Sequence, residues 1–412
     1  MLKNATTTQD AAIDGNNPFK IKVQGPWEEH LVDHKDRLLV QLPRIPRDIQ
    51  FLQIEDGTPS NTEWSLLGGH FTSVKNLEMN SGFDEDWNDE KLPLHWPLER
   101  LLISSACGEV FQSPTVLEGR VKHLILLLTS GLRFEGPTSE ELCRADKEAI
   151  SRGEKEARRI GKIEMVYIPE LVADSMSKRY ASYDEEPEPS QEPPLLLPKE
   201  VPVNLKKLEI LENDAIDAFD RMTLALPHAV ENLSTLNIRS THNLDFHFTN
   251  ERLFPMFLPQ LTNLKTLVLS VGEVFKDNTI LTTLYEQFPP NLSTLRLRGP
   301  ASLVRSDRWT DWVDSFASSD FLPKLERLSF VLDLHYEQKN TNKSENKSND
   351  VFGTGKKKLV DAPDDMLREA QDACKRLYGA VERRGVKVEP FYDHWSEHST
   401  LFKQVDERWM RL

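Results

Sequence analysis

The sequence has few features of a catalytic or metal-binding protein. Its three cysteines, Cys107, Cys143 and Cys374, lie far apart and include no CxxC pair. Such cysteines predict neither a disulfide framework nor a zinc site, and they fit a reducing compartment. The chain also lacks the phosphate-binding and nucleophile motifs GxxxxGKS/T, GxGxxG and GxSxG. We therefore expect neither an enzymatic activity nor a cofactor.

Histidine spacing gives little support for a metal site. His30 and His34 are four residues apart, like a helical pair of metal ligands, but no HExxH glutamate or third ligand accompanies them. We interpret this pair as solvated and the histidines of segment 394–398 as surface or cap residues. The glycine pair Gly68–Gly69 is interpreted as a turn rather than as a phosphate cradle. The sequence therefore predicts no metal ligand.

Positive charge and long apolar runs are also scarce. The chain has 51 Lys+Arg against 66 Asp+Glu, a formal net charge of -15, which disfavours binding to a nucleic-acid backbone. The longest apolar run, near 124–132, is too short to cross a bilayer, and the polar first residues contain no secretory signal. We expect a cytoplasmic or nuclear protein without a nucleic-acid or membrane partner.

One short phrase dominates the sequence instead. The pattern L-x-x-L-x-L recurs about 23 to 25 residues apart near the start of the chain and about 28 to 33 residues apart near its end. Close copies begin at Leu205, Leu233, Leu264, Leu292 and Leu325, and looser copies begin at Ile49, Val74, Leu98, Val121 and Ile163. The last two apolar positions alternate and so point to one face of a strand. Because one strand cannot bury that face alone, the copies predict a stacked parallel sheet with a continuous core.

Amphipathic segments between the later copies predict the crossover helices that a parallel sheet requires. They span 213–226, 279–288, 308–322 and 364–385. Prolines before the following strands, at Pro227, Pro259, Pro289 and Pro323, end the crossovers and favour extended backbone. Segment 386–391 is predicted as a final edge strand. The chain is therefore predicted to have an α/β fold.

The repeats predict a single domain, 21–391, that follows a disordered tail, 1–20. Insertions interrupt this domain near 138–160, 182–202 and 337–358. We interpret the first as a charged helix and the other two as flexible loops. Residues 392–412 are expected to cap the end of the stack, because terminal repeats need covering.

The later repeats also resemble those of a known family. The phrase FLPKLERLSF, 321–330, and the preceding RWTDWVDSF, 308–316, resemble irregular fungal leucine-rich-repeat proteins of the F-box type. The resemblance implies a solenoid, with a curved parallel sheet and helices on its convex side, and the role of a ubiquitin-ligase adaptor. An F-box opens with a phrase similar to LP-x-E, whereas residues 38–54 contain Pro43 and Pro46 in LLVQLPRIPRDIQFLQI. We therefore expect no Skp1-type adaptor to bind the N-terminal segment.

The outward strand positions identify a candidate binding face. Arg239, Arg296, Arg298 and Arg327 occupy such positions on late strands, and Tyr167 belongs to an apolar part of the earlier face. Arginine and tyrosine are frequent interface anchors. We predict a protein-interaction scaffold or substrate-recognition subunit whose concave face binds a partner with an acidic segment. For the arginines, the alternative to such a partner is the chain's own acidic loop, 184–192, as an intramolecular cover. The alternative function is an enzyme or small-molecule-binding protein that uses the concave cleft, which a buried carboxylate or histidine cluster would favour.

Overall fold

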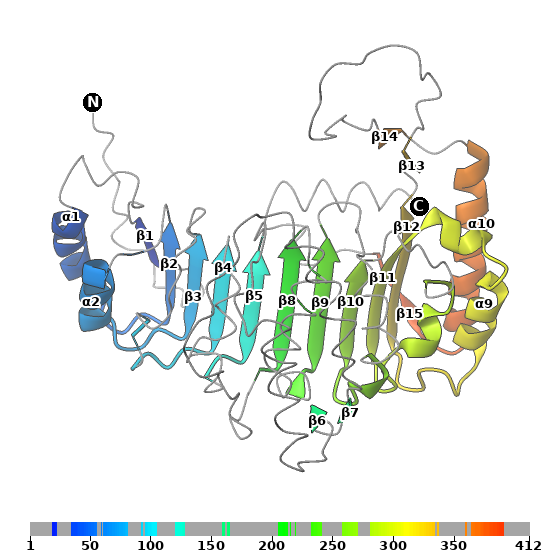
Figure 1. Cartoon of the computed structure of the whole chain (residues 1–412), viewed down its shortest axis with the longest axis horizontal. Helices are drawn as coiled ribbons and strands as arrows, with labels where there is room; N and C mark the ends of the chain where they lie inside the picture. The colour runs from blue at the N-terminus through cyan, green and yellow to red at the C-terminus, as the bar shows by residue number, and fades with distance from the viewer. Residues whose placement is uncertain are drawn as a thin grey trace, which may run out of the picture. The chain divides into compact units, whose positions relative to one another are not determined.

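The repeated phrase forms the strands of one parallel β-sheet except the first and the last (Figure 1). Eleven strands pair in the order β1-β2-β3-β4-β5-β8-β9-β10-β11-β12-β15. They are β1 (Phe19–Lys22), β2 (Phe51–Glu55), β3 (Asn76–Asn80), β4 (Arg100–Ser104), β5 (His123–Leu127), β8 (Lys207–Glu212), β9 (Thr235–Ser240), β10 (Thr266–Ser270), β11 (Thr294–Pro300), β12 (Arg327–Asp333) and β15 (Lys387–Val388). Every predicted copy of the phrase except the one at Ile163 supplies a strand, so the predicted α/β class is confirmed.

The computed structural model describes residues 19–22, 34–55, 59, 61–80, 92–93, 95–104, 120–127, 159–160, 163–164, 205–212, 215, 219, 232–240, 258–270, 281–333, 336–337, 359–360 and 364–390. The chain divides into an N-terminal unit, residues 1–235, and a C-terminal unit, residues 236–412. The N-terminal unit contains β1 to β8 and the C-terminal unit contains β10 to β15, while β9 includes the boundary.

Strict register aligns the apolar positions of the phrase in the N-terminal unit. Leu77 pairs with Leu101, Leu101 with Leu124, and Leu124 with Leu208. All four side chains are fully buried. Because each strand places its leucine directly beside those of its neighbours, the core of this unit is a continuous row that no single repeat could bury.

Backbone hydrogen bonds in the turns fix this register. The carbonyl of Lys75 accepts a bond from Glu99 N at 2.8 Å and another from Arg100 N at 3.0 Å. The same paired arrangement recurs at the carbonyls of Gln50, Glu99, Lys122 and Lys206 in this unit and of Lys265 and Ser293 in the C-terminal unit. Each turn therefore positions the next, which explains why the phrase keeps its spacing between the first two leucines.

Two helices of the N-terminal unit were not predicted. They are α1 (His34–Gln41), which is followed by the 3-10 helix η2 (Leu42–Arg44), and α2 (Asn61–His70). The interpretation of Gly68–Gly69 as a turn is wrong, because both residues lie in the last turns of α2. A Cβ atom at Gly68 would lie 2.8 Å from Pro93 Cγ, so close packing explains this glycine. Arg47 binds the end of α2, since its guanidinium donates to the carbonyls of Gly69 and His70.

Helices are confirmed within the predicted segments 308–322 and 364–385 of the C-terminal unit, but both end earlier than predicted, as α9 (Trp309–Ala317) and α10 (Asp364–Glu382). Trp309, Trp312 and Phe316 of α9 are buried at helical spacing, and the ring of Trp312 stacks on both neighbours. Trp312 also donates its indole N–H to the carbonyl of Thr282 at 2.7 Å. The aromatic stripe thus fastens α9 to the preceding crossover.

The other predicted crossovers are described only in part. In segment 279–288, residues 281–282 are helical and Leu284–Gln287 form the 3-10 helix η7. Two further 3-10 helices, η6 (Leu258–Gln260) and η8 (Ala301–Arg305), were not predicted. Of segment 213–226, only Ala215 and Phe219 are described, and both are helical and buried. Within the described residues, no helix is long and apolar enough to span a membrane.

Several predicted boundaries differ from the structure. The copy of the phrase at Ile163 does not join the main sheet, because β7 (Ile163–Glu164) pairs antiparallel with β6 (Arg159–Ile160) and β5 pairs directly with β8. Residues 159–160 are therefore strand rather than the end of helix 138–160. The predicted tail 1–20 ends inside β1.

The remaining predicted segments are described only at their edges. Glu337 ends β13 (Tyr336–Glu337), which pairs antiparallel with β14 (Leu359–Val360), so the predicted loop 337–358 begins in a strand. β15 covers part of the predicted final strand 386–391. Segments 182–202 and 392–412 lie outside the described residues.

Candidate functional site

The predicted arginine face belongs to the C-terminal unit. Alternation along β11 places Arg296 and Arg298 opposite the buried Leu297. Pairing of β11 with β12 sets Arg327 beside Thr294, which lies on the same side of β11 as the two arginines. Strand register therefore brings three of the four predicted arginines onto one face of two neighbouring strands.

The four arginines differ in their access to solvent. Arg239, at the corresponding face position of β9, and Arg298 are each 1% exposed. The side chain of Arg296 is 17% exposed. Arg327 is exposed, and its Nη2 and Nε donate to Thr294 Oγ1 at 3.0 and 3.2 Å. Arg296 and Arg327 are thus the members of the predicted set that an external partner can contact.

A carboxylate that sequence reasoning missed lies among these arginines. Glu389 follows β15, and its Oε1 lies 2.9 Å from Lys387 Nζ while its Oε2 lies 3.9 Å from Arg296 Nη2. The hydrogen bond from Lys387 lowers the pKa of Glu389, and the charges of Lys387, Arg327 and Arg296 act in the same direction against the opposing effect of burial. The alternation of segment 386–391 was the signal that could have found it, because it places Lys387 and Glu389 on one face.

The structure assigns none of the other candidate residues to this face, because most of them are not described. Tyr167 lies outside the described residues, as do His30 and the histidines of 394–398. His34 is the first residue of α1. Across the part of the chain that the structure describes, no group of three or more His, Cys, Asp or Glu side chains could hold a metal ion.

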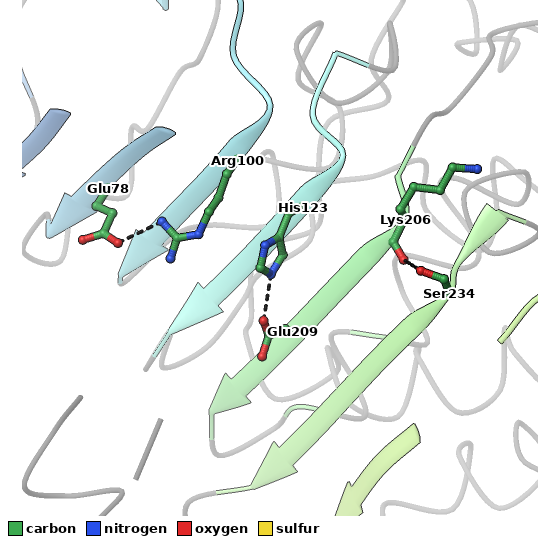
Figure 2. Close-up of polar contacts among 6 residues, drawn as sticks. All are labelled: Glu78, Arg100, His123, Lys206, Glu209 and Ser234. Carbon is green, nitrogen blue, oxygen red and sulfur yellow. Dashed lines mark hydrogen bonds and ion pairs between the residues drawn. The ribbon is translucent and has the colours of Figure 1, made fainter. Parts of the chain in front are cut away.

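A second polar site lies on the sheet face of the N-terminal unit, as Figure 2 shows. Arg100 Nη1 on β4 donates to Glu78 Oε1 on β3 at 2.9 Å. His123 Nε2 on β5 lies 2.7 Å from Glu209 Oε1 on β8. Both carboxylates are buried, Glu78 at 6% and Glu209 at 5% exposure. Each buried carboxylate therefore has a basic side chain on a neighbouring strand.

Register explains how these four side chains meet. Arg100 and His123 are direct partners on β4 and β5, and the apolar pair Leu102 and Ile125 lies two residues further along the same strands. Glu78 pairs with Leu102, and Glu209 pairs with Ile125, so a buried apolar pair separates the two carboxylates. A histidine hydrogen-bonded to a carboxylate can move a proton.

Sequence reasoning did not select this site, although two of its signals were available. Glu78 and Glu209 occupy the middle outward position of their repeats, where an acidic side chain between core leucines is conspicuous. The partners Arg100 and His123 occupy the position before the second leucine. The pairing of these side chains across strands could not be predicted from the sequence. A long insertion separates β5 from β8, so the sequence does not indicate that the two strands are neighbours.

An open polar groove of about 670 Å³ lies where β10, β11 and β12 begin. Its lining includes Asn263, Lys265, Asn291, Ser293, Lys324 and Glu326 and none of the four predicted arginines. Asn291 joins adjacent turns, because its Nδ2 donates to the carbonyl of Thr262 at 2.8 Å and its Oδ1 accepts from Lys324 Nζ at 2.7 Å. The groove is therefore separate from the candidate face.

Comparison of the chain with protein-family models, curated proteins and solved structures found no match. Two surfaces are candidates for function: the arginine face of the C-terminal unit and the paired carboxylates of the N-terminal unit.

Proposed function

We propose that the chain is a leucine-rich-repeat solenoid that acts as a protein-interaction scaffold or substrate-recognition subunit. Its binding surface is the arginine face of the C-terminal unit, defined by Arg296, Arg327 and Lys387. Its partner presents an acidic segment. The observation that carries the proposal is the convergence of these three cations around one carboxylate, that of Glu389.

The chemistry of the face supports this kind of partner. A guanidinium binds a carboxylate through two parallel hydrogen bonds, which supplies geometric specificity as well as attraction. The formal net charge of the whole chain is -15, so a cationic face attracts an acidic segment only locally. We therefore expect an affinity that falls as salt screens the face.

The test is a double substitution of the accessible arginines, Arg296→Gln with Arg327→Gln. Arg298 is left intact, because a polar replacement of this buried residue would disturb folding. Arg383→Gln, at an exposed position just after α10, is the matched control. Affinity purification with quantitative mass spectrometry should show partner recovery lost from the double variant and retained by the control. Equal recovery from a correctly folded double variant would remove this face from consideration.

The resemblance to F-box-type proteins also suggests a ubiquitin-ligase adaptor, with docking to Skp1 as the point to test. In the described N-terminal segment, Leu39 and Val40 of α1 are the exposed large apolar side chains, at 45% and 59% exposure. We expect Skp1 not to co-purify with the full chain. Co-purification that Leu39→Glu with Val40→Glu abolishes would overturn this expectation and establish the adaptor role.

A second candidate function is an enzyme or small-molecule-binding protein. The pair formed by His123 and the buried Glu209 favours it, because a carboxylate-held imidazole is a common acid–base element. A thermal-shift screen of metabolites should then reveal a ligand whose stabilisation His123→Gln removes. A screen in which wild type and His123→Gln respond alike to every compound speaks against a site at this pair.

A further inference from the structure

We infer that Glu389 is an internal ligand of the arginine face, so that its carboxylate occupies the place beside Arg296 that a partner's carboxylate takes on binding. The inference rests on the proposed function and adds a form of regulation to it. The acidic segment of the partner must displace one of the chain's own side chains. The face is therefore partly self-inhibited.

Strand pairing places Glu389 in this position. Lys387 pairs with Arg327 and Val388 with Leu328, and the N–H of Glu389 donates to the carbonyl of Leu328 at 2.9 Å. Glu389 thus follows β15 alongside β12 and falls next to Ser329. The backbone fixes the carboxylate on the arginine face instead of leaving it on a free loop.

The residue between the two charges is small. Ser329 pairs with Arg296 across β11 and β12, so Glu389, Ser329 and Arg296 form one row across three strands. Parallel strands lie about 4.8 Å apart, so the outer members of the row are about 10 Å apart at the backbone. The short, buried Ser329 side chain leaves room above β12 for the two long side chains to approach each other.

The two contacts of Glu389 are unequal. Lys387 Nζ lies 2.9 Å from one oxygen, within hydrogen-bond distance, whereas Arg296 Nη2 lies 3.9 Å from the other. A separation of 3.9 Å is too long for a hydrogen bond, so the attraction between Arg296 and Glu389 is coulombic. A partner's carboxylate that forms two hydrogen bonds with the guanidinium makes the stronger contact. On binding, Glu389 stays in contact with Lys387, and the partner's carboxylate binds Arg296.

This arrangement predicts that removing the internal carboxylate tightens binding. The variant is Glu389→Gln, which keeps the shape of the side chain and removes its charge. The matched control is Glu326→Gln, an exposed glutamate in the turn before β12, which removes the same charge away from the face. The probe is a fluorescein-labelled polyglutamate peptide, titrated at low salt and followed by fluorescence anisotropy. Circular dichroism of each variant confirms that it is folded.

We expect Glu389→Gln to bind the peptide about two- to fivefold more tightly than wild type, the factor that corresponds to release of one partly exposed ion pair. Glu326→Gln should match wild type, and Arg296→Gln should weaken binding in either background. If Arg296→Gln weakens binding but Glu389→Gln leaves it unchanged or weaker, the inference that Glu389 is an internal ligand is wrong, while the proposed binding face remains supported. If no variant binds the peptide, or Arg296→Gln has no effect, the proposed face fails and the internal ligand fails with it.

Discussion

Replacing Arg384 with methionine should destabilise the C-terminal unit, because one guanidinium there binds three backbone carbonyls. Nη1 donates to the carbonyl of Phe316 at 2.8 Å, and Nη2 donates to those of Phe321 at 2.7 Å and Leu322 at 3.2 Å. Phe316 belongs to the last turn of α9, and the other two belong to the turn that leads toward β12. Arg384 therefore ties the end of α10 to the path between α9 and the sheet.

The magnitude follows from the number and kind of these bonds. A hydrogen bond to a charged donor contributes about 1.5 to 3 kcal/mol, and bonds that share one donor group are not additive. Desolvation lowers the pKa of Arg384, so burial of the charge opposes part of this gain. Leu322, whose carbonyl accepts one of these bonds, has a φ of 46°, a left-handed conformation that is unfavourable for leucine. We expect Arg384→Met to lower the free energy of unfolding by about 2 to 4 kcal/mol.

Hydrogen exchange with mass spectrometry is the suitable assay, because it reports the C-terminal unit separately from the rest of the chain. Peptides that cover α9 and β12 should exchange faster in Arg384→Met, and the midpoint of urea unfolding should fall. Arg383→Met is the control, since this neighbouring arginine is exposed and should change stability by less than about 0.5 kcal/mol. Equal protection in the two variants would refute the role given to Arg384.

Three further predictions test the core, the helix α2 and the acid response. Leu295→Ala, at a fully buried strand position, should lower the free energy of unfolding in urea by about 2 to 5 kcal/mol, and a loss below about 0.5 kcal/mol would contradict its burial. Gly68→Ala should destabilise by about 1 to 3 kcal/mol because its Cβ would meet Pro93 Cγ, whereas Gly69→Ala, whose Cβ meets nothing within 4 Å, should stabilise by up to about 1 kcal/mol; equal thermal shifts would contradict this reading. The pKa of Glu389 is lowered in the folded state, so its stabilisation is present above the usual carboxyl pKa of about 4.3 and is lost as the pH falls through the lowered value. Urea unfolding should therefore show that wild type is more stable than Glu389→Gln at neutral pH and equally stable in strong acid. A stability difference that persists in acid would contradict stabilisation by the ion pairs of Glu389.

The main sheet could be predicted because its signal is local and repeated. Each copy of the phrase carries its own core leucines, and identical turn bonds at Lys75, Lys265 and Ser293 keep successive copies in register. One segment matches the apolar pattern of the phrase without joining the main sheet. It begins at Ile163, which pairs antiparallel with Ile160. The apolar pattern alone specifies a half-buried strand, and only the neighbouring turns decide which sheet it joins.

The elements that were not predicted have little signal in their own sequence, and contacts with other parts of the fold stabilise them. β1 has only four residues, so the sequence Phe19–Lys22 does not indicate a strand by itself. The strand is identified by its pairing with β2. α2 contains two consecutive glycines, which reduce helix propensity by about 1 kcal/mol each relative to alanine. Burial of Trp64, Leu67 and Phe71 outweighs that penalty, and the approach of Pro93 makes Gly68 necessary.

The arginine face shows where strand periodicity stops being informative. Alternation correctly assigns Arg296 and Arg298 to one side of β11, because side-chain direction depends only on position in the strand. Exposure depends on what packs against each position, and it differs sharply over two residues: Arg298 is 1% exposed, whereas the Arg296 side chain is 17% exposed. One partner of Arg296 is Glu389, a residue that lies alongside only when β15 pairs with β12. Counting the arginines on a strand face therefore predicts the sign of the charge on that face. How much of this charge is accessible depends on residues from distant parts of the chain that pack beside it.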